Sequence, residues 1–279
     1  MKFHPTGEKI QLDVDTLNED LKVRGADRMR HLMHPDEAFG LIFDFDNVIV
    51  DALSLRKNAW RKVASASGLK LPAIERPSMY SLLPEKAVMD VLRWTDDIKK
   101  AKDFSWQLSQ MYVDEISQNS QLCPGVEKWL KSMQEFHVPC ALVSTLGRET
   151  LQGVLKRLDI FDKFTAIGAA DDDMETKAQQ YLSAAISICR PPEQCVVFVA
   201  SPEGIVAAHN CTMRAVAVIG PCTAPQLRSA DLTVASLDEL SVYNIRRLFA
   251  NRGNEFMDLK KKFSKGDETK RKLRHGTST

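Results

Sequence analysis

Residues 40–51, with the sequence GLIFDFDNVIVD, decide the fold of this chain. The apolar run that ends at Asp44 predicts a buried strand of a parallel sheet. Asp44 and Asp46 lie two positions apart and therefore point to the same side of an extended chain. Two carboxylates directed into one space repel each other, and a bound cation relieves that repulsion. Open α/β sheets bind their ligands at the carboxyl ends of such strands.

Apolar runs alternate with helical spacings along the rest of the chain, which predicts an α/β fold with a Rossmann-like parallel sheet. The segment 52–121 carries only helical spacing, so we expect an all-helical insertion after the first strand. Its first helix has Leu55, Ala59 and Val63 on one face and ends at Gly68. Further strands are expected at 137–143, 164–168, 194–199, 214–220 and 231–235, and further helices at 15–33, 84–94, 98–116, 126–133, 148–158, 205–208 and 237–249.

The composition excludes several classes of protein. The chain has 279 residues, is 44% hydrophobic and has a net charge of +1, so its overall charge does not steer it toward nucleic acid. It has no apolar run long enough to span a membrane. We expect no signal or transit peptide, because residues 1–13 lack an apolar core and are not rich in serine. The six cysteines form no C-x-x-C pair, which favours reduced thiols over disulfides.

The stretch FDFDNVIVD resembles motif I of the haloacid dehalogenase (HAD) superfamily, Asp-x-Asp-x-(Val/Thr). The resemblance implies a HAD core with an inserted helical C1 cap. It assigns Asp44 as the nucleophile that forms an aspartyl-phosphate, and Asp46 as the general acid and base. Asn47 stands where the family usually has glycine, a modest departure because Asn tolerates the left-handed backbone region.

Two later segments resemble motifs II and III of the same superfamily. The apolar run to residue 143 ends in Ser144 and Thr145, which the resemblance assigns to phosphate binding. Ser144 has a second interpretation, as the N-cap of the helix expected at 148–158. Lys177 matches the motif III lysine, whose ammonium would screen the nucleophile and the phosphoryl group. The family often has proline after this lysine, and this chain has Ala178.

Motif IV departs from the family pattern. The superfamily commonly has two acids after its fourth strand, and they coordinate Mg²⁺; this chain has Val199 and Ala200 at those positions. Asp44 and the backbone carbonyl of Asp46 would then be left to hold the metal, with Glu203 as a candidate replacement. The alternative is that Glu203 only stabilises the first turn of the next helix. We therefore expect a weakened Mg²⁺ site.

Other charged residues leave alternatives open. Arg56 and Lys57 would contact a substrate anion, or they are exposed helix charges. The run 171–173 consists of three aspartates, and solvated loop acids are preferred over a metal cluster. His209 is expected to be structural.

The resemblance divides the chain as follows. We expect an N-terminal extension at 1–38, a HAD core at 39–51 and 122–250, a helical cap at 52–121, and a basic, disordered tail at 251–279. A protein partner could bind through the extension or the tail.

Two functions remain possible at this point. The first is a Mg²⁺-dependent phosphatase for a small phosphorylated metabolite. The second is a pseudoenzyme that serves as a binding or assembly module, since both motif IV acids are replaced. Residues 38–43, AFGLIF, also resemble a plant, plastid-type group of HAD proteins. That group includes phosphatases proposed for the riboflavin precursor 5-amino-6-(5-phospho-D-ribitylamino)uracil, which implies a chloroplast setting.

Overall fold

The computed structural model describes residues 13–21, 39–72, 79–80, 82–172 and 174–249. The basic tail and most of the N-terminal extension lie outside the described residues. Of the helix expected at 15–33, the described part is α1 (Val14–Asp20), which begins after the N-cap Asp13. None of the described helices is both long and apolar enough to cross a membrane. All six cysteines are free thiols, as expected.

Six parallel strands form the sheet in the order β3-β2-β1-β4-β5-β6. The strands are β1 (Gly40–Asp44), β2 (Cys140–Val143), β3 (Ala166–Gly168), β4 (Cys195–Val199), β5 (Arg214–Val218) and β6 (Leu232–Val234). The chain adds β2 and β3 on one side of β1 and the remaining strands on the other side. The strand order therefore reverses beside β1, and open α/β sheets bind ligands at such a switch point.

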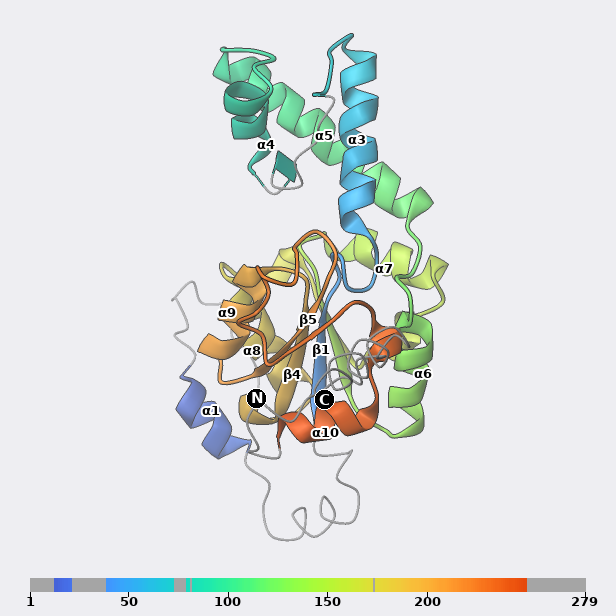
Figure 1. Cartoon of the computed structure of the whole chain (residues 1–279), viewed down its shortest axis with the longest axis vertical. Coiled ribbons are helices and arrows are strands. Elements are labelled where there is room, and N and C mark those ends of the chain that lie inside the picture. Colours follow the sequence, from blue (N-terminus) through green and yellow to red (C-terminus); the bar gives the residue numbers. More distant parts are fainter. Residues whose placement is uncertain (1–12, 22–38, 73–78, 81, 173, 250–279) are drawn as a thin grey trace, which may run out of the picture.

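Helices cover both faces of this sheet (Figure 1). They are α6 (Val126–Glu135), α7 (Arg148–Arg157), α8 (Lys177–Ser187), α9 (Pro202–Asn210) and α10 (Val242–Leu248). Leu41 and Phe43 belong to the apolar cluster that contains α6, α7 and α10, whereas Ile42 belongs to the cluster that contains α8 and α9. Neighbouring residues of β1 thus enter opposite layers, because side chains alternate along a strand. Both faces of β1 are buried, as its continuous apolar run predicts.

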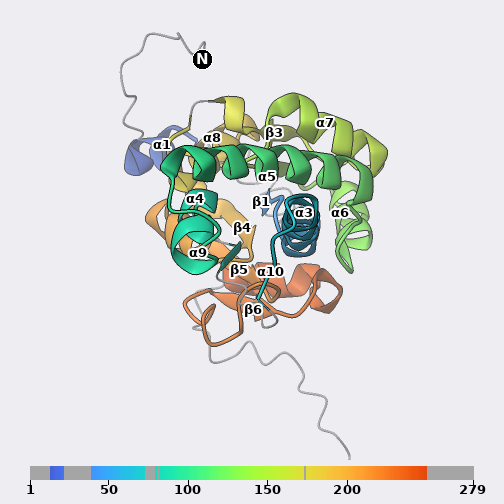
Figure 2. The ribbon, with the colours of Figure 1, turned by 90° about the horizontal axis from the view of Figure 1, so that it is seen from above.

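A helical insertion separates β1 from β2 and stands beyond the carboxyl ends of the strands (Figure 1). It comprises α3 (Ala52–Ala66), α4 (Pro84–Lys86), the π-helix η3 (Ala87–Val91) and α5 (Ile98–Asn119). Seen from above, α3 and α5 lie over the sheet (Figure 2). The insertion has an apolar cluster of its own, which includes Trp60, Tyr80 and Leu108. The division into core and cap stays a prediction, and this separate cluster supports it.

The two connections between the insertion and the sheet run side by side. Val50, just before α3, forms an antiparallel bridge with Leu122, just after α5. The amide of Cys123 also donates a hydrogen bond to the carbonyl of Ile49, 2.8 Å away. The chain therefore enters and leaves the insertion at one place.

Two expectations about helices were wrong. The last helix begins at Val242 and not at residue 237, because Leu237–Glu239 is a separate 3-10 turn and Leu240 is extended. The helix expected at 84–94 is divided into α4 and η3 and ends at Val91. The sequence interpretation also missed α8, the helix that follows β3.

Candidate active site

Asp44 lies at the carboxyl end of β1 and is 4% exposed. Lys177 Nζ lies 2.6 Å from its Oδ2, and the hydroxyl of Tyr181 lies 3.0 Å from its Oδ1. Burial raises the pKa of Asp44, and the ion pair with Lys177 opposes that rise. Both carboxylate oxygens thus have a partner from the protein.

Helix α8 places both partners of Asp44. Lys177 is its first residue and Tyr181 follows four positions later, so the two side chains share one face. The helix start is fixed by a capping box, in which Thr176 Oγ1 accepts from the amide of Gln179 and the Gln179 side chain accepts from the amide of Thr176. Lys177 therefore lies beside Asp44, as predicted, while the role of Asp44 as nucleophile stays a prediction.

Asp46 is held by a residue of the insertion. Its Oδ2 forms an ion pair of 2.7 Å with the Arg56 guanidinium, which comes from α3. Arg56 also lies 5.1 Å from the centroid of the Tyr112 ring on α5. Burial raises the pKa of Tyr112, and Asp46 raises it further, so this phenol stays neutral. Within the described part of the chain, the buried Oδ1 of Asp46 has no hydrogen-bond partner.

The turn after Asp46 is fixed by Asn47. Asn47 has φ 63°, in the left-handed region that asparagine was expected to tolerate. Its Oδ1 accepts a hydrogen bond from the amide of Leu53, 2.8 Å away in the first turn of α3. This residue therefore ties the acidic turn to the start of the insertion.

Ser144 and Thr145 follow β2, but they do not share one environment. Ser144 is 4% exposed, and its Oγ accepts from the amide of Leu146 at 3.1 Å. The alternative N-cap role for Ser144 is wrong, because the N-cap of α7 is Gly147. Thr145 is exposed and lines a cavity beneath the insertion.

The aspartates of the run 171–173 that the structure describes organise the start of α7. The Asp171 carboxylate accepts from the amide of Arg148 at 2.6 Å, and Asp172 forms an ion pair with the Arg148 side chain at 2.5 Å. These two acids thus have defined partners and are not simply solvated. Asp173 lies outside the described residues. His209 is paired with Asp231 at 2.9 Å, which agrees with its expected structural role.

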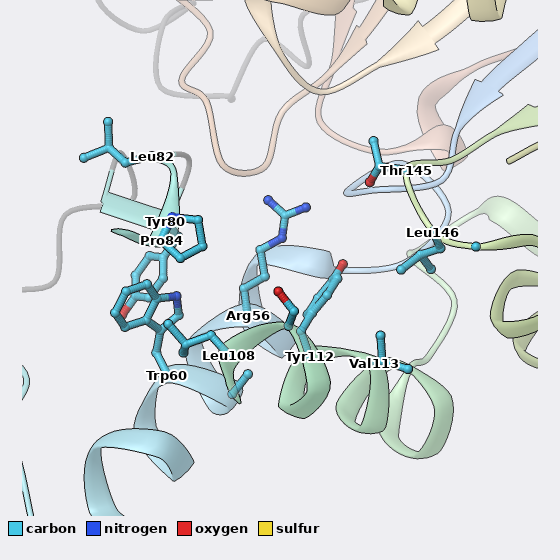
Figure 3. Close-up of a pocket in the computed structure, with 13 residues that line it drawn as sticks. Arg56, Trp60, Tyr80, Leu82, Pro84, Leu108, Tyr112, Val113, Thr145 and Leu146 are labelled. Carbon is cyan, nitrogen blue, oxygen red and sulfur yellow. The ribbon is translucent and has the colours of Figure 1, made fainter. Parts of the chain in front are cut away.

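Two cavities meet beside Arg56. The first, which we call the acidic cavity, has a volume of about 640 Å³, and its lining includes Asp44, Asp46, Lys177, Ala200 and Glu203. The second, the aromatic cavity, has a volume of about 380 Å³, and its lining includes Trp60, Tyr80, Leu108, Tyr112 and Leu146 (Figure 3). Arg56 and Tyr80 line both. The structure therefore brings together four of the predicted site residues, Asp44, Asp46, Lys177 and Glu203, whereas Thr145 lines the aromatic cavity.

The residues of the acidic cavity do not fit a Mg²⁺ ion held by a cluster of carboxylates. Val199 is fully buried, and Ala200 offers only a methyl group to the cavity. Glu203 lies in the first turn of α9 and is exposed. Across the described ranges, no three side chains of Asp, Glu, His or Cys come close enough together to hold a metal ion. A weakened Mg²⁺ site with Glu203 as a ligand stays a prediction, and this geometry does not support it.

The residues that sequence reasoning missed are Tyr181 and Tyr112. For Tyr181 a signal was present: Thr176 and Gln179 match the T-x-x-Q capping pattern, which starts a helix and places residue 181 on the same face as Lys177. Tyr112 could not be placed in this way, because its contact with Arg56 joins two helices that are far apart in the sequence.

The fold and the site define an α/β protein with a parallel sheet and a ligand site at its switch point. The chain belongs to the haloacid dehalogenase-like hydrolases, since the model of that family matches residues 41–218. The resemblance noted around Asp44 is thereby confirmed.

Individual relatives agree with this assignment. The chain is 29% identical over 213 residues to the chloroplastic 5-amino-6-(5-phospho-D-ribitylamino)uracil phosphatase of Arabidopsis thaliana, covering 75% of this chain and 57% of the relative. It is 24% identical over 223 residues to hexitol phosphatase B of Escherichia coli, covering 76% of this chain and 98% of the relative. A HAD hydrolase of family IA, variant 3, from Entamoeba histolytica has a similar fold, with a TM-score of 0.66 at 16% identity, covering 76% of this chain and 100% of that one.

Proposed function

We propose that this chain is a phosphatase that hydrolyses a phosphomonoester of a small metabolite in the acidic cavity. The observation that carries the proposal is the position of Asp44, which lines this cavity at the end of the central strand with Lys177 beside it. The family and the phosphatase names of the two curated relatives support the same activity.

The proposed reaction has two steps. In the first, a carboxylate oxygen of Asp44 attacks phosphorus, and the bond to the leaving oxygen breaks. That oxygen takes a proton from Asp46 and departs as an alcohol. In the second, Asp46 takes a proton from water, which attacks the aspartyl-phosphate and releases inorganic phosphate and free Asp44. Lys177 balances negative charge during both steps.

The two oxygens of Asp46 suit a proton-transfer role. Oδ2 is fixed by Arg56, so the carboxylate is held in one orientation. Oδ1 is buried and has no protein partner among the described residues. An Asp46 protonated at Oδ1 would donate that proton to the leaving oxygen, and the carboxylate left behind would accept a hydrogen bond from the attacking water. We propose that the helical insertion acts as the cap, because Arg56 comes from it.

A second function is favoured by Val199 and Ala200. Neither side chain can bind a metal ion, and metal polarisation supplies several kcal/mol to reactions of this kind. A chain that keeps the acidic cavity but has no bound metal ion would bind phosphorylated molecules without hydrolysing them. A protein partner of such a binding module would bind the tail or the N-terminal extension.

The Arabidopsis relative suggests finer details. We propose the riboflavin precursor named for that protein as one candidate substrate, and a chloroplast as the setting. This chain spans 57% of the length of that relative, so both details rest on partial similarity.

The test is release of inorganic phosphate from a panel of phosphomonoesters. Wild-type protein is expected to release phosphate, and Asp44→Asn is expected to abolish the release while the fold is kept. Asp114→Asn, an exposed position on α5, is the matched control and should keep full activity. Unchanged turnover by Asp44→Asn contradicts the proposed reaction. Saturable binding of the same compounds without turnover by the wild type would establish the binding module instead.

A further inference from the structure

We infer that the substrate carries a planar aromatic or heteroaromatic ring on its leaving-group side, and that the aromatic cavity holds this ring. The inference rests on the proposed function for the position of the phosphate, and it names the class of substrate that the site accepts.

The wall of the aromatic cavity is mainly apolar. Trp60 and Tyr80 are 5% and 4% exposed, and their rings pack edge to face with centroids 6.2 Å apart. Leu108 and Leu146 are also buried. Aromatic side chains favour a ring in offset or edge contact, which adds about 0.5 to 1.5 kcal/mol beyond the area buried. A polyhydroxylated chain would lose its contacts with water against such a wall.

Arg56 lies between the aromatic cavity, where the substrate ring would bind, and Asp46 in the acidic cavity. Its guanidinium binds Asp46 and lies against the Tyr112 ring, so its plane is already fixed between the two cavities. Figure 3 shows this side chain extending between Tyr80 on one side and Tyr112 on the other. A guanidinium stacks on flat π systems as well as on carboxylates. A ring beside Arg56 therefore gains a contact that a saturated group does not.

The position of Asp46 sets the direction of the leaving group. Its Oδ2 binds Arg56 and its charge raises the pKa of Tyr112, and both of these partners line the aromatic cavity. With the phosphate at Asp44, the substituent on the leaving oxygen extends past Arg56 into that cavity. A volume of about 380 Å³ is near the lower end for small-molecule sites, so one ring system fits and a dinucleotide does not.

The experiment measures binding without turnover. Asp44→Asn is titrated calorimetrically with benzyl phosphate, cyclohexylmethyl phosphate and glycerol 3-phosphate. Benzyl phosphate is expected to bind about tenfold more tightly than glycerol 3-phosphate, and more tightly than its saturated analogue. Adding Ser109→Phe, which places a side chain into the aromatic cavity from α5, should remove the preference. Ser105→Phe, one turn earlier and outside the lining, should keep it.

Equal affinities for the three compounds, no binding of any of them, or an unchanged preference in Ser109→Phe would overturn the inference. The titration does not depend on hydrolysis, so the two proposals can fail separately. If Asp44→Asn prefers benzyl phosphate but the wild type releases no phosphate, the phosphatase proposal fails and the inference about the ring stands.

Discussion

Tyr181 donates a hydrogen bond from its hydroxyl to Oδ1 of Asp44 across 3.0 Å, joining the middle of α8 to the end of β1. The same hydroxyl lies close to Gly204 at the start of α9, where a Cβ atom would be 3.1 Å from it and 2.9 Å from Cγ1 of Val199. The phenol thus lies near Val199, the residue at the position where the family pattern has its first motif IV acid. A neutral donor from α8 thus binds the oxygen of the buried Asp44 carboxylate that Lys177 does not bind.

Replacing Tyr181 by Phe tests this relationship. The variant leaves a buried carboxylate oxygen without its donor, which costs about 1 to 3 kcal/mol. Urea unfolding should show that loss, and the pKa of Asp44 should rise further, because the hydrogen bond lowers it. Tyr243→Phe, at a side chain that is 65% exposed, is the control and should change the stability little. A loss of the same size in both variants would contradict a specific role for Tyr181.

Replacing Ala200 by Asp is expected to create a Mg²⁺ response. Ala200 lines the acidic cavity together with Asp44 and Asp46, so a carboxylate there adds another acid beside these two. The melting temperature of Ala200→Asp should fall in a metal chelator and recover when Mg²⁺ is added. At a Mg²⁺ concentration a hundred times the dissociation constant, the gain in the free energy of unfolding would be about 2.7 kcal/mol. Wild type and the uncharged Ala200→Asn should not respond. A saturable Mg²⁺ response of the wild type would show that its own residues bind the ion, and it would contradict this prediction.

The ion pair between Lys62 and Glu115 should make the stability depend on pH. It joins α3 to α5, and Glu115 is 2% exposed while Lys62 is 55% exposed. The hydrogen bond from Lys62 lowers the pKa of Glu115 below its ordinary 4.5. The ion pair therefore stabilises the fold fully at pH values above the ordinary pKa of 4.5, and this stabilisation is lost as the pH falls through the lowered pKa of Glu115.

Lys62→Met should accordingly cost about 1.5 kcal/mol at pH 7, toward the low end for bonds to charged groups because Lys62 is half exposed. The difference from wild type should vanish in acid unfolding experiments below the lowered pKa of Glu115. Lys102→Met, at an exposed position of α5, serves as the control. A cost that persists unchanged in acid would mean that packing of the lysine stem, and not the charge, is responsible.

Two glycines give opposite expectations for substitution by alanine. Gly125, the N-cap of α6, has φ 84°, and a Cβ atom there would lie 2.3 Å from the amide nitrogen of Asp238. Gly125→Ala should therefore destabilise the fold by about 1 to 3 kcal/mol. Gly153 lies in α7 with no atom within 4 Å of the added carbon, so Gly153→Ala should stabilise it by about 0.5 to 1 kcal/mol. Thermal unfolding measures the melting temperature of both variants. Equal changes in melting temperature relative to the wild type would contradict the expectation.

The parts of the fold that the sequence predicted are those with strong local signals. The apolar run to Asp44 became the central strand, and the spacing of Leu55, Ala59 and Val63 became the buried face of α3. The predicted start of the last helix at residue 237 was wrong, because Leu240 is extended between two short helical segments. Packing of Leu240 onto the core sets this arrangement, and periodicity does not reveal it.

The candidate site was predictable where one residue type implies one role. The match of Lys177 to motif III predicted a position beside Asp44, and the structure has it there. Val199 and Ala200, which stand where the family has two acids, were visible directly in the sequence. The ion pair between Arg56 and Asp46 was not predicted, because the sequence left Arg56 either as a contact for a substrate anion or as an exposed helix charge. Thr145 was predicted to bind phosphate beside Asp44, but its side chain lines the aromatic cavity and not the acidic cavity.

The bridge between Val50 and Leu122 has a consequence for how this architecture diversifies. Both ends of the helical insertion are fixed at this one place, and the part of the insertion around Trp60, Tyr80 and Leu108 packs around an apolar cluster of its own. A lineage can therefore lengthen, shorten or exchange that lobe without disturbing the strand order below it. New substrate preferences can arise by recombination at this junction, while Asp44 stays at the end of β1.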